Sequence, residues 1–220
     1  MKYIIFDMEF TVLRSQQHLA ETIEIGAIEL KEGQDGTLVM TNLFHSYVQP
    51  SLRPKLSKLT TEFTGVTQEQ VNKAPLFPGA ISNFKEWLEG DDYYLCSWGP
   101  DDKHQLVREC HAQGVDREWL KNYNDIQLPY TRLNGADHGQ RIGLKRSLQL
   151  EEIPFIGKQH NALDDAFNTA KLFKKIFPQL KLEQNNASND ALYISEVVYS
   201  TGGIDNKPFG NLAQLLQLAL

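Results

Sequence analysis

The order of extended and helical segments constrains the fold of this chain more than any other feature of its sequence. Three segments with the composition of β-strands open the chain, and one further strand follows among helical segments. Strands first, and then a strand among helices, predict a mixed β-sheet with helices packed on its faces. The sequence is therefore assigned to the α/β class. The predicted strands are residues 2–9, 21–30, 37–48 and 93–97.

Apolar residues at helical spacing, with glycine or proline at the segment ends, predict the helices. The clearest of them starts after Asn161 and is closed by Pro178. Each helix can cover part of a sheet face with its apolar side. The predicted helices are residues 57–63, 68–72, 75–89, 101–113, 143–150 and 162–177.

The residues after Pro178 differ in character from those before it. Residues 184–190 are polar and predict a linker, residues 191–200 predict a strand, and residues 211–220 predict a Leu-rich helix. We therefore expect one domain at residues 1–178 and a C-terminal extension at residues 179–220. The last segment carries an apolar stripe, which packs either on the same chain or on a second copy in a homodimer. The stripe consists of Leu212, Leu215, Leu216 and Ala219.

The composition excludes several classes of protein. No apolar run approaches the roughly 20 residues that cross a bilayer, and the opening apolar run, which Asp7 interrupts, is too short for a signal peptide. We expect a cytoplasmic protein with no membrane partner. The net charge of −6 argues against a non-specific nucleic-acid coat protein and leaves nucleases open. Cys96 and Cys110 are the only cysteines, so neither a disulfide framework nor a zinc-thiolate site is expected.

Two carboxylates end the first predicted strand. Asp7 and Glu9 are two residues apart, so both lie on one face of the strand. Adjacent carboxylates repel each other, and one pKa rises unless cations lie between them. Divalent cations with oxygen ligands meet that need. The alternative is a solvated strand end, which a lone Asp-x-Glu pattern does not exclude.

A second pair of carboxylates follows the fourth predicted strand, at Asp101 and Asp102. Ligand sites in α/β sheets cluster at such strand ends. At about 100° per residue, Asp102 borders the buried face that Leu106 helps to define, whereas Asp101 points toward water. Asp102 is therefore the better metal-ligand candidate. The alternative for both residues is to cap the helix and complement its dipole.

The third pair of carboxylates, Asp164 and Asp165, starts the clearest helix. The same geometry groups Asp164 with the polar face and places Asp165 on the flank of the core. Asp165 is therefore the candidate ligand. His160 precedes this helix in a loop and lies five residues before Asp165. A lone loop histidine is usually a surface residue, but here it lies near a carboxylate that could bind metal.

These motifs, in this order, resemble those of the DEDDh exonucleases, the DnaQ-like 3′→5′ exonucleases of the ribonuclease H-like superfamily. The resemblance covers residues 1–178. One departure is Asp101, where some relatives have a second aromatic residue, and none falls on the five catalytic positions. Two stretches are similar to the flanks of the family's third motif: Gly143-Leu144-Lys145 and Leu163-Asp164-Asp165-Ala166-x-Asn168-Thr169-Ala170. Two others are similar to the Eri-type and KapD-type branch that trims RNA 3′ ends: Ser97-Trp98-Gly99 and Phe63-Thr64-Gly65-Val66-Thr67.

The resemblance implies a ribonuclease H-like fold and phosphodiester hydrolysis with two divalent ions, Mg²⁺ or Mn²⁺. It implies that Asp7 bridges both ions, and that His160 is the general base that accepts a proton from water. The remaining metal ligands that it implies are Glu9, Asp102 and Asp165.

The same resemblance implies where the 3′ end binds. Phe10 and Thr11 would hold the terminal sugar, and Phe63 and Thr64 would contact the terminal base. For Phe63, packing in the core is an equal alternative. A few basic side chains are candidates for phosphate contacts, although an ordinary solvated surface is the commoner role of such charges. These are Lys145, Arg146 and Lys158.

The leading functional hypothesis is an exonuclease that releases nucleoside 5′-monophosphates from single-stranded 3′ ends, with RNA favoured over DNA. The first alternative is a DNA-directed proofreading or repair exonuclease. The second is a catalytically silent nucleic-acid-binding module on the same fold. A silent module has no need for four mutually repelling carboxylates and a titrating histidine, which argues against the second alternative.

Overall fold

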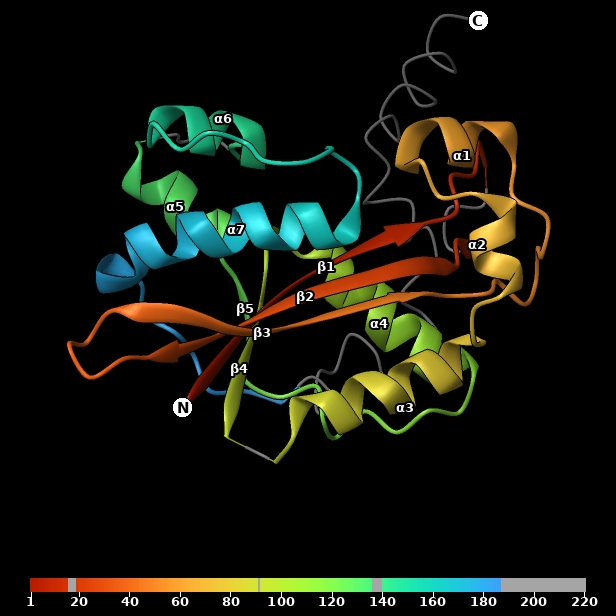
Figure 1. The fold of residues 1–220 in the computed structure, drawn as a ribbon, viewed down its shortest axis with the longest axis horizontal. Coiled ribbons are helices and arrows are strands. Elements are labelled where there is room, and N and C mark those ends of the chain that lie inside the picture. Colours follow the sequence, from red (N-terminus) through yellow and green to blue (C-terminus); the bar gives the residue numbers. More distant parts are fainter. Residues whose placement is uncertain (16–18, 91, 136–139, 187–220) are drawn as a thin grey trace, which may run out of the picture. The chain divides into compact units, whose positions relative to one another are not determined.

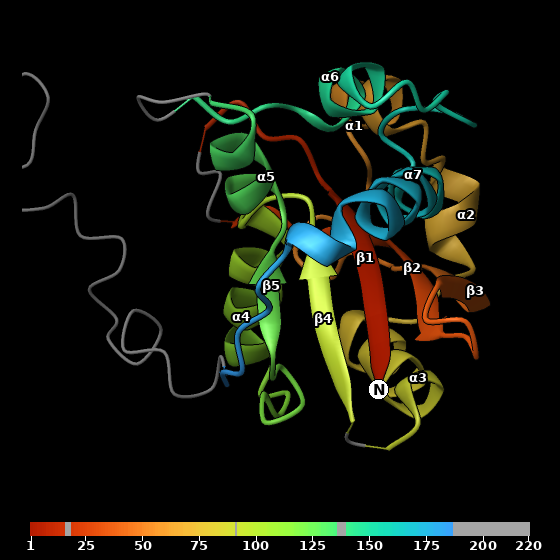
Figure 2. The same ribbon diagram turned by 90° about the vertical axis from the view of Figure 1, so that its left-hand side faces the viewer.

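The computed structural model describes residues 1–15, 19–90, 92–135 and 140–186. Its centre is a five-stranded mixed sheet in the order β3-β2-β1-β4-β5 (Figure 1). β3, β2 and β1 pair antiparallel, whereas β1, β4 and β5 pair parallel. Figure 2 shows β5, β4 and β1 side by side. The predicted mixed sheet is confirmed. The strands are β1 (Lys2–Phe10), β2 (Thr22–Glu32), β3 (Leu38–Tyr47), β4 (Tyr93–Ser97) and β5 (Tyr123–Asp125).

Helices cover both faces of the sheet. α7 lies across one face, with α6 beyond it, and α3 and α4 lie on the other face (Figure 1). This layered arrangement confirms the predicted α/β fold. The helices are α1 (Lys58–Thr64), α2 (Gln68–Asn72), α3 (Phe77–Leu88), α4 (Asp101–Ala112), α5 (Gln127–Leu133), α6 (Leu144–Leu150) and α7 (Ala162–Ile176), followed by the 3-10 helix η2 (Phe177–Gln179).

The four predicted strands and six predicted helices are all present, with ends that differ by at most two residues. β5 and α5 were not predicted. β5 has only three residues, which is too short for an alternating pattern, and α5 contains Pro129. The strand and the helix predicted at residues 191–200 and 211–220, and the homodimer predicted through them, lie outside the described residues.

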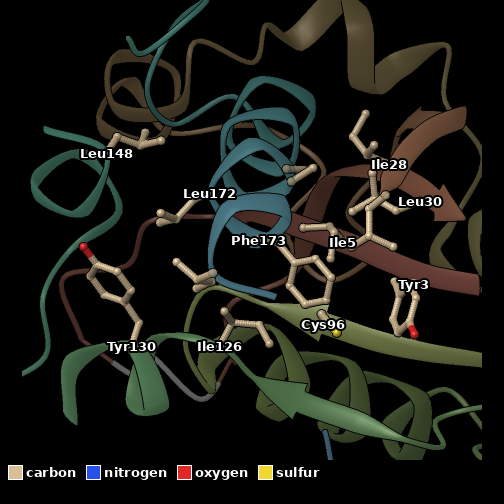
Figure 3. Packing of buried hydrophobic residues seen from close by; sticks show 14 residues of the cluster. Tyr3, Ile5, Ile28, Leu30, Cys96, Ile126, Tyr130, Leu148, Leu172 and Phe173 are labelled. Atoms are coloured by element: carbon tan, nitrogen blue, oxygen red, sulfur yellow. The ribbon is translucent and has the colours of Figure 1, made fainter. Parts of the chain in front are cut away.

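The apolar core beneath α7 fixes this helix on the sheet. Tyr3 and Ile5 of β1 and Leu30 of β2 are buried against it. Phe173 points from α7 into the same cluster (Figure 3), and its ring centroid lies 5.8 Å from that of Tyr3. Burying a side chain of this size contributes roughly 1.5–3 kcal/mol. The C-terminal half of α7 is therefore held by hydrophobic packing.

The described chain ends along the outer edge of β5. The Asn185 side chain accepts a hydrogen bond from the Tyr123 backbone N–H at 2.9 Å and donates to the Tyr123 carbonyl at 2.7 Å. Asn124 accepts from the backbone N–H of Glu183 at 2.8 Å. Asn185 thus satisfies backbone groups of an edge strand that would otherwise be open. Within the described residues, no helix is long and apolar enough to span a membrane.

Candidate active site

One face of β1 changes from apolar to acidic along the strand. Tyr3 and Ile5 are buried under α7, and the next two residues on the same face are Asp7 and Glu9. Met8, between them, points to the opposite face and is buried. The carboxylates therefore lie at the carboxyl end of β1, which is the end where α7 begins.

The neighbouring strand β2 also carries acidic and small residues in place of apolar ones at this end of the sheet. Glu24 lies opposite Glu9 in the antiparallel register, and Gly26 lies opposite Asp7. A β-carbon at Gly26 would lie 2.3 Å from the backbone nitrogen of Leu163 and 2.4 Å from the carbonyl carbon of Ala162. Only glycine lets the first turn of α7 come this close to the sheet.

Asp102 enters the same region from the start of α4. It is 6% exposed, and one of its carboxylate oxygens accepts a hydrogen bond from the Met8 backbone N–H at 3.0 Å. The neighbouring Asp101 is exposed. The orientation that helical spacing predicts for these two residues is confirmed, and a backbone contact ties Asp102 directly to the segment that carries Asp7 and Glu9.

A short loop presents His160 ahead of α7. The backbone N–H of His160 donates to a carboxylate oxygen of Asp165 at 2.8 Å, and His160 has φ 60°, in the left-handed region. Asp164 accepts from the backbone N–H of Lys158 at 2.8 Å. Gly157 has φ 88°, and a β-carbon there would lie 2.3 Å from the carboxyl carbon of Asp164. Asp164 thus holds the loop.

The five residues predicted to be catalytic line one open cleft of about 670 Å³. Within it, carboxylate oxygens of Glu9 and Asp165 and a ring nitrogen of His160 all lie within 4.8 Å of one another. The five residues come from β1, α4, α7 and the loop before α7, and they are Asp7, Glu9, Asp102, His160 and Asp165. Their roles in catalysis and metal binding remain predictions.

The carboxylates in the cleft hold protons more tightly than free carboxylates do. Burial, and then the charges of the neighbouring carboxylates, raise the pKa of Asp7 well above its ordinary value. The same causes raise the pKa of Glu9 to about 8. Burial raises the pKa of Asp102 to about 7 and that of Asp165 to about 6, although a backbone N–H donor acts in the opposite direction in each case. Without cations, this set therefore shares protons near neutral pH.

The donor set fits hard divalent cations. The cleft offers carboxylate oxygens and one imidazole but no thiolate, and oxygen ligands favour Mg²⁺ and Mn²⁺ over softer metals. Bound cations would offset the repulsion that raises the pKa values of these groups. Asp7, Glu9, Asp102 and Asp165 are the residues that would hold such ions.

The predicted substrate residues divide into two groups. Phe63 and Phe10 line the cleft, and Phe63 is 48% exposed, so the alternative of packing in the core does not hold for it. Its ring centroid lies 4.1 Å from that of His160. Thr11 and Thr64 are buried and do not line the cleft. Their hydroxyl groups bond within the chain, since Thr11 accepts from the Glu21 N–H and Thr64 donates to a carbonyl of α1.

Two of the three predicted phosphate contacts lie on the cleft wall. Lys145 and Arg146 of α6 line it, whereas Lys158 lies over Gly65 at the end of α1. Trp98, Asp101, Gln149 and Gln159 also line the cleft. The two glutamines could not be identified from the sequence, because polar residues at such positions are common on any exposed surface.

Sequence reasoning missed Glu24. It is fully buried, and its carboxylate accepts hydrogen bonds from the Asn161 side chain at 2.8 Å and from the Ala162 backbone N–H at 3.2 Å. The ring of His45 lies 2.7 Å from the same carboxylate. The sequence signal that could have found Glu24 is a charged residue within a mostly apolar strand. Glu29 of the same strand carries the same signal but lies away from the cleft.

Comparison with known proteins agrees with this arrangement. A family model described as Exonuclease (RNase_T) matches residues 4–173. "ERI1 exoribonuclease 2" of Danio rerio is 32% identical over 196 residues, which cover 79% of this chain and 34% of that protein. "Probable 3'-5' exonuclease KapD" of Bacillus subtilis (strain 168) is 29% identical over 177 residues, covering 79% of this chain and 83% of that protein.

"ERI1 exoribonuclease 3" of Mus musculus is 26% identical, with 79% of this chain and 53% of that protein covered. The chain thus spans between a third and about half of the length of these ERI1 relatives.

Solved structures share the fold. The nuclease domain of 3'hExo, described as a DEDDh family member bound to rAMP, has a TM-score of 0.72 and 23% identity, over 84% of this chain and 96% of that one. Cell-death related nuclease 4 (CRN-4) has a TM-score of 0.71 and 19% identity, over 84% of this chain and 66% of that one. The match over residues 4–173 shows that this chain belongs to the exonuclease family, and it shares the fold of these solved structures, in line with the resemblance of its motifs to those of the DEDDh exonucleases.

Proposed function

We propose that this chain is a divalent-metal-dependent 3′→5′ exonuclease that shortens single-stranded RNA and releases nucleoside 5′-monophosphates. The observation that carries the proposal is the convergence of Glu9, Asp165 and His160 within 4.8 Å, in a cleft that Asp7 and Asp102 also line. The names of the ERI1 relatives and membership in the exonuclease family support it.

His160 is suited to accept a proton from the attacking water. Burial, and then the charge of Lys158, lower the pKa of His160 below its ordinary value, so the ring is neutral at pH 7. The contact between its backbone N–H and Asp165 keeps the ring beside the carboxylates. Two bound ions, Mg²⁺ or Mn²⁺, would supply the charge that stabilises the transition state and makes water more acidic.

The walls of the cleft are suited to a single-stranded 3′ end. The exposed ring of Phe63 can stack on a terminal base, and such stacking contributes about 1–3 kcal/mol per base. Lys145 and Arg146 can neutralise phosphates on the opposite wall. Phe10 lies next to Glu9 and lines the cleft where the terminal sugar would bind.

Degradation of end-labelled RNA and DNA of matched sequence tests the proposal. We expect Mg²⁺-dependent release of nucleoside 5′-monophosphates from the 3′ end, faster with RNA than with DNA, and no hydrolysis in excess chelator. Undiminished hydrolysis in chelator would contradict the metal-dependent mechanism. Faster degradation of DNA would favour a proofreading or repair exonuclease, and metal binding without hydrolysis would favour a silent module.

Replacing the basic pair on α6 tests the substrate path. Lys145→Ala and Arg146→Ala should weaken binding of single-stranded RNA and reduce its salt dependence, whereas Lys174→Ala, at an exposed site on α7, is the matched control. Equal effects of all three changes would argue against a phosphate track on α6.

The mass in solution would test the predicted homodimer, and fractionation of cells would test the predicted cytoplasmic location.

A further inference from the structure

The first turn of α7 is attached to the sheet by polar contacts, in contrast to the rest of that helix. Glu24 is 0% exposed and lies on the face of β2 that meets this turn, two residues before Gly26. Gly26 provides the space in which Ala162 lies against the strand. Glu24 provides the hydrogen-bond acceptors that hold the turn there.

The contacts of Glu24 are directed at the helix start. One carboxylate oxygen accepts from the Asn161 side-chain amide, and the other accepts from the Ala162 backbone N–H. That N–H belongs to the first helical residue and has no partner within the helix. The Asn161 side-chain oxygen caps the helix by accepting from the Asp164 N–H at 3.0 Å. Glu24 therefore orients the capping residue as well as the first helical residue.

The position of this turn determines where two site residues lie. His160 immediately precedes Asn161, and Asp165 lies in the first turn and bonds the His160 backbone N–H. Glu9 is the cross-strand neighbour of Glu24. A displacement of the turn would therefore move His160 and Asp165 together, away from Glu9.

We propose that Glu24 is a positioning residue for the metal site, which acts by docking Asn161 and the first turn of α7 onto the sheet so that Asp165 and His160 meet Glu9. This proposal rests on the proposed metal site. It assigns to Glu24 no contact with substrate and no direct role as a metal ligand.

Glu29 provides a matched control. It lies on the same strand, is 3% exposed, and also has several polar partners, which are Thr41, Lys2 and Lys31. It does not line the cleft. Removing either carboxylate leaves its polar partners without an acceptor and destabilises the fold, but of the two only Glu24 connects to the start of α7.

The experiment measures Mg²⁺ affinity by calorimetry, kcat and KM on a single-stranded oligoribonucleotide, and Tm, for the full chain and three variants. Glu24→Ala should weaken Mg²⁺ binding by about 10–100-fold and lower kcat, with little change in KM. Asn161→Ser keeps a capping oxygen but cannot reach Glu24, so it should weaken Mg²⁺ binding in the same direction. Glu29→Ala should lower Tm and leave Mg²⁺ affinity unchanged.

Native Mg²⁺ affinity in both Glu24→Ala and Asn161→Ser would overturn the proposal, as would an equal loss in Glu29→Ala. If Glu24→Ala does not fold, the Mg²⁺ affinity of Asn161→Ser alone tests the proposal, and a native affinity would overturn it. Absence of Mg²⁺ binding by the unaltered chain would overturn the proposed metal site itself, and this inference with it. The two failures are therefore distinguishable.

Discussion

The two ends of α7 rest on the same face of the same two strands but are held by opposite kinds of contact. Toward its C-terminus, Phe173 and Ile176 pack on the apolar residues of β1 and β2 in the core described above. At its N-terminus, the helix meets Asp7, Glu9 and Glu24 across the close approach at Gly26. The apolar end stabilises the fold, and the acidic end carries the proposed chemistry.

The contrast between the two ends of α7 explains how the fold tolerates repelling charges in its interior. An acidic cluster that raises its own pKa values costs free energy when it is ionised. The hydrophobic half of the same layer offsets that cost and keeps the sheet and helix in register. Activity and stability should therefore respond separately to changes at the two ends.

The largest expected effect is at the acidic end. Asp165→Asn should lower turnover by about 10³-fold or more, since it removes a charge from the proposed metal site, while it keeps an oxygen that can accept from the His160 N–H. Asp164→Asn should leave most of the activity, because the amide oxygen can still accept from the Lys158 N–H. Steady-state kinetics measures the turnover of both variants, and circular dichroism checks that they are folded. Equal losses from both changes would contradict the inward orientation assigned to Asp165.

His160→Ala should lower the rate by about 10²–10⁴-fold with Mg²⁺ binding retained, as expected for a lost general base. The native rate should rise with pH as the imidazole loses its proton, and because burial lowers the pKa of His160, this step should lie below the ordinary pKa of histidine. The variant should lack the step. His111→Ala, at an exposed site on α4, is the control. An unchanged pH profile in His160→Ala would assign the base to another group.

At the apolar end, Phe173→Ala should lower the free energy of unfolding by about 3–5 kcal/mol, because Phe173 is fully buried against Tyr3 and Phe177. Activity per folded molecule should stay near the native value under conditions where the variant is folded. Urea denaturation and kinetics on the folded fraction measure both quantities. A loss of turnover comparable to that of Asp165→Asn would mean that the two ends are not separable.

The last expected effect is on the pH dependence of stability. The pKa values of Glu9, Asp102 and Asp165 are raised to about 8, 7 and 6, so the folded chain holds protons that the unfolded chain has lost. Without metal, the free energy of unfolding should therefore fall as pH rises from about 5 to 8. Excess Mg²⁺ should remove this fall.

Urea denaturation at several pH values, with and without Mg²⁺, measures this dependence. Glu9→Gln removes one of the titrating groups and should flatten the metal-free curve. A metal-free stability that rises over this pH range would show that the carboxylates are not the groups that dominate the difference.

Much of the fold was predictable because its signals are local. The inward orientation of Asp102 followed from helical spacing alone, and the boundaries of α2 and β4 followed from short-range patterns. β5 was not predictable, because three residues that are ordered by pairing with β4 carry no pattern of their own. α5 was hidden by Pro129.

The site was predictable only in part. Its carboxylates and histidine follow recognisable spacings, but the contact of Phe63 with His160 joins residues 97 positions apart. Glu24 could not be distinguished from Glu29 until the register of β2 and the place where α7 begins were known. Such relations depend on tertiary structure, which a single sequence does not display.

The left-handed backbone of His160 costs stability at the residue that is proposed to be the general base. At φ 60° a glycine would fit with less strain than any residue that has a β-carbon. Variants selected only for heat resistance should therefore include His160→Gly. This variant should be more stable than His160→Ala, but it lacks the proposed base. A chain that keeps histidine there forgoes about 1 kcal/mol or more of stability. Heat resistance alone is therefore a misleading criterion for improving this protein.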